Sequence, residues 1–271
     1  MKDLALKINR YWRVFWWLRR LRVMQRMTYN INFFIMFFGV FLQMVFSIVF
    51  VRVIFGFVGN LAGWGYYEAL VVVASYMILE GLMWVLCAYL GAISIHIKGG
   101  TLDSLLIKPI DAQFLVSAWQ GDPEDSVRLV SGTAVLLYAW QNLDLTFFQT
   151  AANFSVYIFL MISAFIILYS VVLVTRSVSF WLIEAKALHS VSDAITKMSQ
   201  YPTDIFYHFI ARLVFSVLMP LAFMATVPAK IFIHGFDWQL VGASFLLAAI
   251  FFYGSRRFWL YALRHYASAS S

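Results

Sequence analysis

Long apolar stretches alternate with short polar ones along the whole chain. The first stretch without Asp, Glu, Lys or Arg covers residues 27–51, and a helix of that length rises about 37 Å, enough to cross a bilayer core of roughly 30 Å with some tilt. Further apolar segments cover residues 69–97, 129–143, 145–175, 213–229 and 238–255. Lipid leaves only helices and closed barrels with their backbone polar groups satisfied, and these runs are longer and more uniformly apolar than barrel strands. The pattern predicts an all-α integral membrane protein with six transmembrane helices.

Residues 1–28 have a different, amphipathic pattern. Apolar side chains recur at spacings of three and four, at Leu4, Ile8, Tyr11, Phe15 and Leu18. Tryptophans stand beside arginines on the rest of the surface, which suits the headgroup layer and anionic lipid. We interpret this arm as an in-plane interfacial helix that contacts membrane lipid. Tryptophans immediately before a spanning helix argue against nucleic acid as the partner of the basic residues.

A second amphipathic segment covers residues 179–200. Lys186, Ser190, Asp193 and Lys197 share one helical stripe. Hydropathy favours a helix on the cytoplasmic surface. The alternative is a helix that crosses the membrane with its polar stripe facing a cavity or a partner.

Composition and charge fit this membrane interpretation. Hydrophobic residues make up 63% of the 271 residues and charged residues 12%, against about 25% charged in soluble domains. The formal net charge is +7. Eight basic residues and one acidic residue lie among the first thirty positions, and the rest of the chain is balanced. The positive-inside rule then places both termini, residues 98–128 and residues 176–197 in the cytoplasm.

Motifs of several enzyme classes are missing from the sequence. The single cysteine, Cys87, allows neither an internal disulfide nor a cysteine metal cluster. We find no phosphate-binding Walker loop, no zinc-protease helix, no nucleophile elbow and no dinucleotide fingerprint. The sequence therefore predicts no catalytic, cofactor-binding or metal-binding residues and no enzymatic activity in this chain. We also expect the first apolar segment to be retained, because no signal-peptide cleavage pattern follows it.

Glu80 is an ionisable residue in the middle of the second apolar segment. A charge at the centre of a spanning helix costs roughly 2.5 to 3.5 kcal/mol on insertion scales and marks a functional hypothesis. Two readings remain open at this point. Glu80 either belongs to a substrate pathway or joins helices as a protonated or paired carboxyl.

The polar segment at residues 98–126 contains the signals of a short helix. Thr101 is a good N-cap, Asp103 lies near the positive helix end, and Pro109 stops the helix. We therefore expect a helix from Thr101 to Lys108. Leu102, Leu105 and Leu106 would then be available to dock into a groove on a cytoplasmic partner.

Here the sequence resembles the membrane (permease) subunits of bacterial ABC transporters, in the type-2 ABC exporter group. The resemblance extends over nearly the whole chain. The segments that carry it are Gly100-Thr-Leu-Asp-Ser-Leu-Leu-Ile-Lys-Pro109, Ser179-Phe-Trp181, Tyr201-Pro-Thr-Asp-Ile-Phe206, Pro220 with Pro228, and Tyr266-Ala-Ser-Ala-Ser-Ser271.

The resemblance implies a single transmembrane domain over residues 1–271, with an interfacial arm, a cytoplasmic coupling helix and a re-entrant element before the last helix. The residues expected to meet an ATPase subunit are Gly100, Thr101, Leu102, Asp103, Leu106, Lys108 and Pro109. The resemblance makes residues 178–199 the fifth span, whereas hydropathy favours residues 210–226. The two assignments conflict, and both keep the termini inside.

The favoured hypothesis is a permease half of an ATP-driven exporter in the bacterial inner membrane. It would move an organic solute, such as a drug, or an amphiphile out of the cytoplasm by alternating access. Its expected partners are two copies of an ATP-binding subunit, which would carry ATP and Mg²⁺, and a second permease half, identical or related. The alternative is an ATP-independent secondary transporter that uses Glu80, Glu184, His189 and Asp193 as a proton relay. A membrane-embedded enzyme is a third reading, without a recognisable catalytic constellation.

Overall fold

The computed structural model describes residues 2–27, 30–119, 121–143, 145, 147–182, 185–205 and 220–266. Within these residues the chain is all helical and contains no strand. The longer helices are α1 (Lys2–Met27), α2 (Asn30–Phe57), α3 (Tyr66–Cys87), α7 (Ser126–Gln141), α8 (Phe147–Ser177) and α12 (Trp238–Arg264). The shorter ones are α4 (Ile93–Lys98), α5 (Asp103–Leu106), α6 (Ala112–Ala118), α9 (Lys186–Lys197) and α11 (Val227–His234).

Among the described residues, four helical segments are long and apolar enough to cross a membrane. They cover Phe34–Phe57, Tyr66–Lys98, Ala152–Phe180 and Trp238–Arg264. These segments correspond to the first, second, fourth and last predicted spans. The third predicted span forms α7, whose 16 residues rise about 24 Å. The expected span at 210–226 falls mostly on residues 206–219, outside the described residues, and its described end leads into the short apolar helix Ala222–His234.

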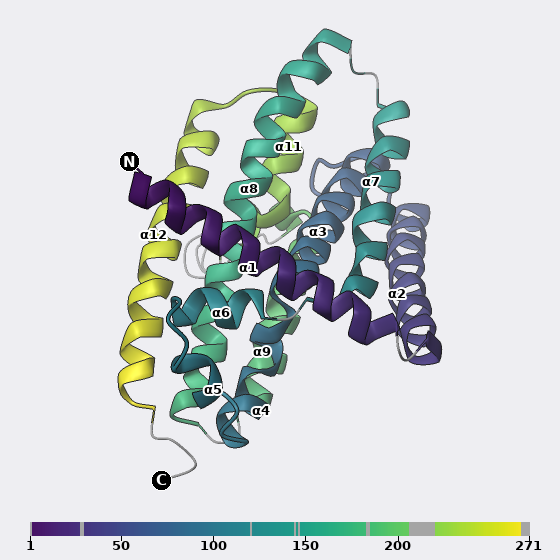
Figure 1. The fold of residues 1–271 in the computed structure, drawn as a ribbon. Coiled ribbons are helices and arrows are strands. Elements are labelled where there is room, and N and C mark those ends of the chain that lie inside the picture. Colours follow the sequence, from purple (N-terminus) through teal and green to yellow (C-terminus); the bar gives the residue numbers. More distant parts are fainter. Residues whose placement is uncertain are drawn as a thin grey trace.

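The second span, α3, forms the centre of the bundle. In the most apolar part of this span two thirds of the residues are buried, whereas in the most apolar part of α2 only 6% are buried. In Figure 1, α7 stands between α3 and α2, and α8 lies between α3 and α12. A Cβ atom on Gly132 of α7 would come within 3.1 Å of the Ile78 backbone nitrogen, and one on Gly81 of α3 within 3.0 Å of the Arg128 Cβ. The two glycines therefore let α3 and α7 approach closely.

The N-terminal arm is one helix, α1, which runs diagonally across the bundle in Figure 1. Its apolar side is anchored by Leu18, which is buried, while Trp12, Trp16 and Trp17 are all more than half exposed. Arg19 donates hydrogen bonds to the backbone carbonyls of Val85 and Ala118, at 2.8 and 3.1 Å. Arg22 pairs with Asp122 at 3.0 Å. These contacts fix α1 to the ends of α3 and α6.

The close approach of α3 and α7 predicts different tolerances for two helical glycines. Gly132→Leu should lower the melting temperature of the purified protein, because overpacking a tight interface costs about 1 to 3 kcal/mol. Gly242→Leu is the matched control, since a Cβ at Gly242 meets no atom within 4 Å and leucine is the better helix former. Equal melting temperatures for the two variants would contradict this account of the packing.

Candidate functional site

The segment between α4 and α6 reverses the chain at one end of the bundle. Gly100 has a φ of +66°, a left-handed conformation that glycine adopts without strain. The helix that follows, α5, is shorter than the predicted Thr101–Lys108 and covers only Asp103–Leu106. Thr101 does not cap it, because the Thr101 hydroxyl bonds to His96 Nδ1 at 2.8 Å. The expected capping role of Thr101 was therefore wrong, and its side chain ties the turn back to α4.

Burial divides the residues of this segment into two groups. The side chains of Leu102 and Leu105 are at most 1% exposed and belong to the main core. Leu106 is half-buried and packs against this core. The expectation that Leu102 and Leu105 are available to a partner was therefore wrong, since they fasten α5 to its own bundle. The exposed residues, which we call the α5 outer surface, are Thr101, Ser104, Ile107, Lys108 and Pro109. Ile107 is the most exposed apolar side chain of this segment, at 84%.

The first and the last helix both contact the chain immediately after α5. Arg10 of α1 donates a hydrogen bond to the Pro109 carbonyl at 3.1 Å. The backbone N–H of Asp111 donates to the Tyr11 hydroxyl at 3.3 Å. Arg256 of α12 binds both carboxylate oxygens of Asp111, at 3.0 and 2.5 Å. The α5 outer surface is thus mechanically connected to α1 and α12.

The electrostatics of this segment follow from the same contacts. Burial alone would raise the pKa of Asp111, but hydrogen bonds from Arg256 and from the backbone N–H of Phe114 lower that pKa below its ordinary value. Burial, together with the nearby Asp103 carboxylate, raises the pKa of Tyr266 to about 12. Tyr266 follows α12 and is the only described residue of the C-terminal resembling segment. Tyr266 therefore lies beside α5.

Glu80 is held in an ion-pair cluster inside the bundle. Its carboxylate accepts a hydrogen bond from Arg128 Nη1 at 2.6 Å. Arg128 also binds Asp125 at 2.7 Å and the side-chain oxygen of Gln43 at 2.7 Å. The two ion pairs are largely buried. One guanidinium thus joins α2 and α3, which are consecutive, to α7, which follows three short α-helices later.

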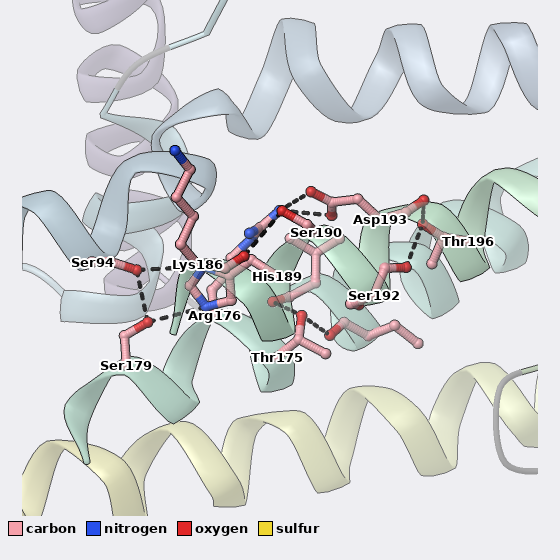
Figure 2. Close-up of polar contacts among 12 residues, drawn as sticks. Ser94, Thr175, Arg176, Ser179, Lys186, His189, Ser190, Ser192, Asp193 and Thr196 are labelled. Carbon is pink, nitrogen blue, oxygen red and sulfur yellow. Dashed lines mark hydrogen bonds and ion pairs between the residues drawn. The ribbon is translucent and has the colours of Figure 1, made fainter. Parts of the chain in front are cut away.

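The amphipathic helix α9 buries a polar face against α8 and the end of α4. Figure 2 shows Arg176 reaching both carboxylate oxygens of Asp193, each at 2.7 Å. His189 Nε2 lies 3.1 Å from the Ser179 hydroxyl, which is 2.7 Å from the Ser94 hydroxyl. Of the expected stripe, Asp193 is bound in this way, whereas Lys186, Ser190 and Lys197 are exposed. Glu184 lies outside the described residues.

The segment from α9 to residue 205 extends from one end of α3 to the other. His189 is next to Ser94, beyond the C-terminal end of α3. At the other end, Asp204 accepts a hydrogen bond from the indole N–H of Trp64 at 3.0 Å, and Trp64 precedes the first residue of α3. Lys230 of α11 binds the same carboxylate at 2.8 Å. This cluster explains why the Tyr201–Ile205 segment and α11 pack together.

A small pocket separates the two ion-pair groups. It has a volume of about 160 Å³, and its lining includes Glu80, Arg128, Asp193 and Lys197. Sequence reasoning selected Glu80 but missed Arg128, Asp125 and Gln43, since their closeness depends on the packing of α2, α3 and α7. Among the described residues, no group of three His, Cys, Asp or Glu side chains is arranged to hold a metal ion.

The helices and their contacts define a multi-pass α-helical membrane protein with a fixed surface segment at one end of the bundle. A family model described as "ABC-2 family transporter protein" matches residues 41–270. The chain belongs to this family and is a permease component of an ABC transporter, not itself an enzyme. Permeases of the family normally work with an ATP-binding subunit. No curated protein and no solved structure matches the chain.

The ion-pair cluster predicts a non-additive pattern of stabilities. Arg128→Gln leaves two buried carboxylates without their cation, a loss of about 3 to 5 kcal/mol, and should strongly lower the melting temperature. Glu80→Gln should cost less, because Arg128 keeps Asp125. Adding Glu80→Gln to Arg128→Gln should restore part of the lost stability, which a double-mutant cycle measures. Strictly additive effects would show that the two side chains are not coupled.

Proposed function

We propose that this chain is a permease half of an ATP-driven exporter, which moves an organic solute or amphiphile out of the bacterial cytoplasm by alternating access. The observation that carries the proposal is the α5 outer surface in an ABC-2 family member. Its residue Pro109 is hydrogen-bonded to the first helix, and Asp111, two residues later, is hydrogen-bonded to the last helix. Two copies of an ATP-binding subunit, carrying ATP and Mg²⁺, would bind this surface in a complex with a second, identical or related permease half.

The proposed topology has six crossings, with both termini inside. The crossings are α2, α3, α7, α8, the segment from α9 to residue 205, and α12. Contacts from His189 to Ser94 and from Asp204 to Trp64 support the fifth crossing, because they lie beyond opposite ends of α3. They favour residues 178–199 over the hydropathy assignment at 210–226. The short helix Ala222–His234 would then be the outer re-entrant element.

The mechanism follows from how the α5 outer surface is held. Closure of the ATPase dimer would push on Ile107, Lys108 and Pro109. Leu102 and Leu105 lie in the core, so the push is transmitted to the bundle and is not absorbed by a loose loop. The bonds from Arg10 and Arg256 transmit it to α1 and α12. Nucleotide binding would in this way shift the populations of inward-facing and outward-facing states.

Of the carboxylates in the alternative proton relay, the two that the structure describes are engaged in ion pairs, which weakens the ATP-independent alternative. Glu80 is bound to Arg128, and Asp193 is bound to Arg176 through both oxygens. His189 contacts serine hydroxyls. We therefore propose that Glu80 acts chiefly in joining helices, with a place in the substrate pathway limited to lining the small pocket that it shares with Asp193.

The α5 outer surface predicts where an ATPase subunit binds. Ile107→Asp should abolish copurification of the permease with its ATP-binding subunit, because an apolar contact is replaced by a buried charge. Val58→Asp is the control, an exposed apolar residue in the connection between α2 and α3 at the other end of the bundle, and should copurify normally. Normal binding by Ile107→Asp would refute the assigned surface. ATP hydrolysis by the purified permease alone would refute the proposal that a separate subunit hydrolyses ATP.

Thiol labelling in intact cells distinguishes the two positions of the fifth span. Ile205→Cys should react with a membrane-impermeant maleimide added outside, whereas Lys186→Cys should react only after the cells are opened. The wild type is the blank, because its single cysteine, Cys87, is buried and burial suppresses thiol reactivity. Labelling of both positions from the inside alone would favour a surface position for α9 and the span at 210–226.

A further inference from the structure

Two adjoining apolar hollows lie along α1. The first, of about 470 Å³, lies among α1, α6, α8 and α12, and Phe165, Ile166 and Phe252 form much of its wall. The second, of about 450 Å³, lies between α1 and α6. Tyr11 and Phe114 line both hollows and pack edge to face, with ring centroids 4.7 Å apart. The hollows therefore run side by side under the arm.

The polar side chains at the edge of the first hollow already bind one another. Arg256 binds Asp111 and the side-chain oxygen of Gln113, the latter at 2.8 Å. Tyr169 accepts a hydrogen bond from the Gln113 amide at 2.9 Å and lies 2.7 Å from the Ser117 hydroxyl. A polar solute would have to displace these contacts. A hydrocarbon chain would bury apolar wall without disturbing them.

The surroundings of the hollows are strongly cationic. Lys7 lines the second hollow directly, and Arg13 and Arg20 are exposed on the same helix. In the described part of the chain, none of these three has an acidic partner. All of the net charge of +7 lies in the first thirty residues. Charge complementarity therefore selects an anionic headgroup over a zwitterionic one.

We propose that the hollows bind an acyl chain of an anionic phospholipid, with its phosphate at Lys7. The proposal rests on the proposed function only in placing α1 at the cytoplasmic membrane surface. Bound between α1 and α6, the lipid would lie beside the Arg10–Pro109 and Tyr11–Asp111 hydrogen bonds. An anionic lipid would thus hold the arm against the chain that follows α5, and the lipid composition would regulate how firmly the α5 outer surface is fixed.

Lipid retention by the full-length permease, without any ATPase, tests the site. The protein is equilibrated with equal amounts of phosphatidylglycerol and phosphatidylcholine of the same chain length, washed in detergent, and analysed by mass spectrometry of the bound lipid. We expect preferential retention of phosphatidylglycerol. Ile166→Trp fills the first hollow and should abolish this retention, while Ile250→Trp, an exposed isoleucine of α12 outside both hollows, should leave it unchanged.

A second pair of variants tests the headgroup contact. Lys7→Gln should reduce the preference for phosphatidylglycerol about fivefold, the effect of removing one cation near a lipid surface. Lys98→Gln removes an exposed charge outside the hollows and should have no effect. Equal retention of the two lipids by the wild type, or retention unaffected by Ile166→Trp, would overturn the proposal.

The fold of the variants and the proposed function are checked separately. Gel filtration and helix content establish that Ile166→Trp is folded, and Ile166→Phe replaces it if it is not. A wild type that retains phosphatidylglycerol but fails to copurify with an ATP-binding subunit would leave the lipid site standing and refute the proposed function. The converse result would refute the lipid site alone.

Discussion

The packing of α2, α3 and α7 depends on one largely buried cation, the guanidinium of Arg128. It binds Glu80, Asp125 and Gln43 at once, and a charge in such surroundings is tolerated only when it is paired and hydrogen-bonded. The pairing requires α3 and α7 to be close. Gly81 makes this possible, because a Cβ at that position would meet the Cβ of Arg128 at 3.0 Å. Gly81, directly after Glu80, thus makes the ion-pair cluster of Arg128 possible. The same cluster holds α2 through Gln43, although few residues of α2 are buried.

The sequence predicts the four long apolar helices of the described residues, because a helix that faces lipid must be apolar over its full length. It also selects Glu80, since a carboxylate in such a run is conspicuous. It does not select Arg128, which lies at the boundary of a predicted cytoplasmic segment, where arginine is ordinary. Which acid meets which base is decided by packing between helices far apart in the chain, and a single sequence contains no record of it.

The segment around α5 illustrates a second limit. Leucines at 102, 105 and 106 are equally consistent with a helix that docks on a partner and one that docks on its own bundle. The structure buries Leu102 and Leu105, which leaves Ile107 outward. Arg10 and Arg19 bind backbone carbonyls. Because every residue has a backbone carbonyl, the identity of the acceptor residue does not predict these hydrogen bonds. The polar face of α9 is likewise satisfied by Arg176 and by serine hydroxyls, contacts that a hydropathy sum cannot register because it scores each side chain separately.

The two ion-pair groups constrain how this bundle can open. Glu80 and Arg128 join α3 to α7, whereas Asp193 and Arg176 join α9 to α8. Each of these two pairs therefore lies within one of two helix units, and the pocket of about 160 Å³ is lined by residues of both units. Separating the α3–α7 unit from the α8–α9 unit would widen the pocket without breaking either pair. A motion within one unit would separate the partners of its ion pair and leave a buried charge unpaired, at a cost of several kcal/mol. The alternating access proposed above would therefore use the boundary between the two units, where Asp193 and Glu80 line the same pocket.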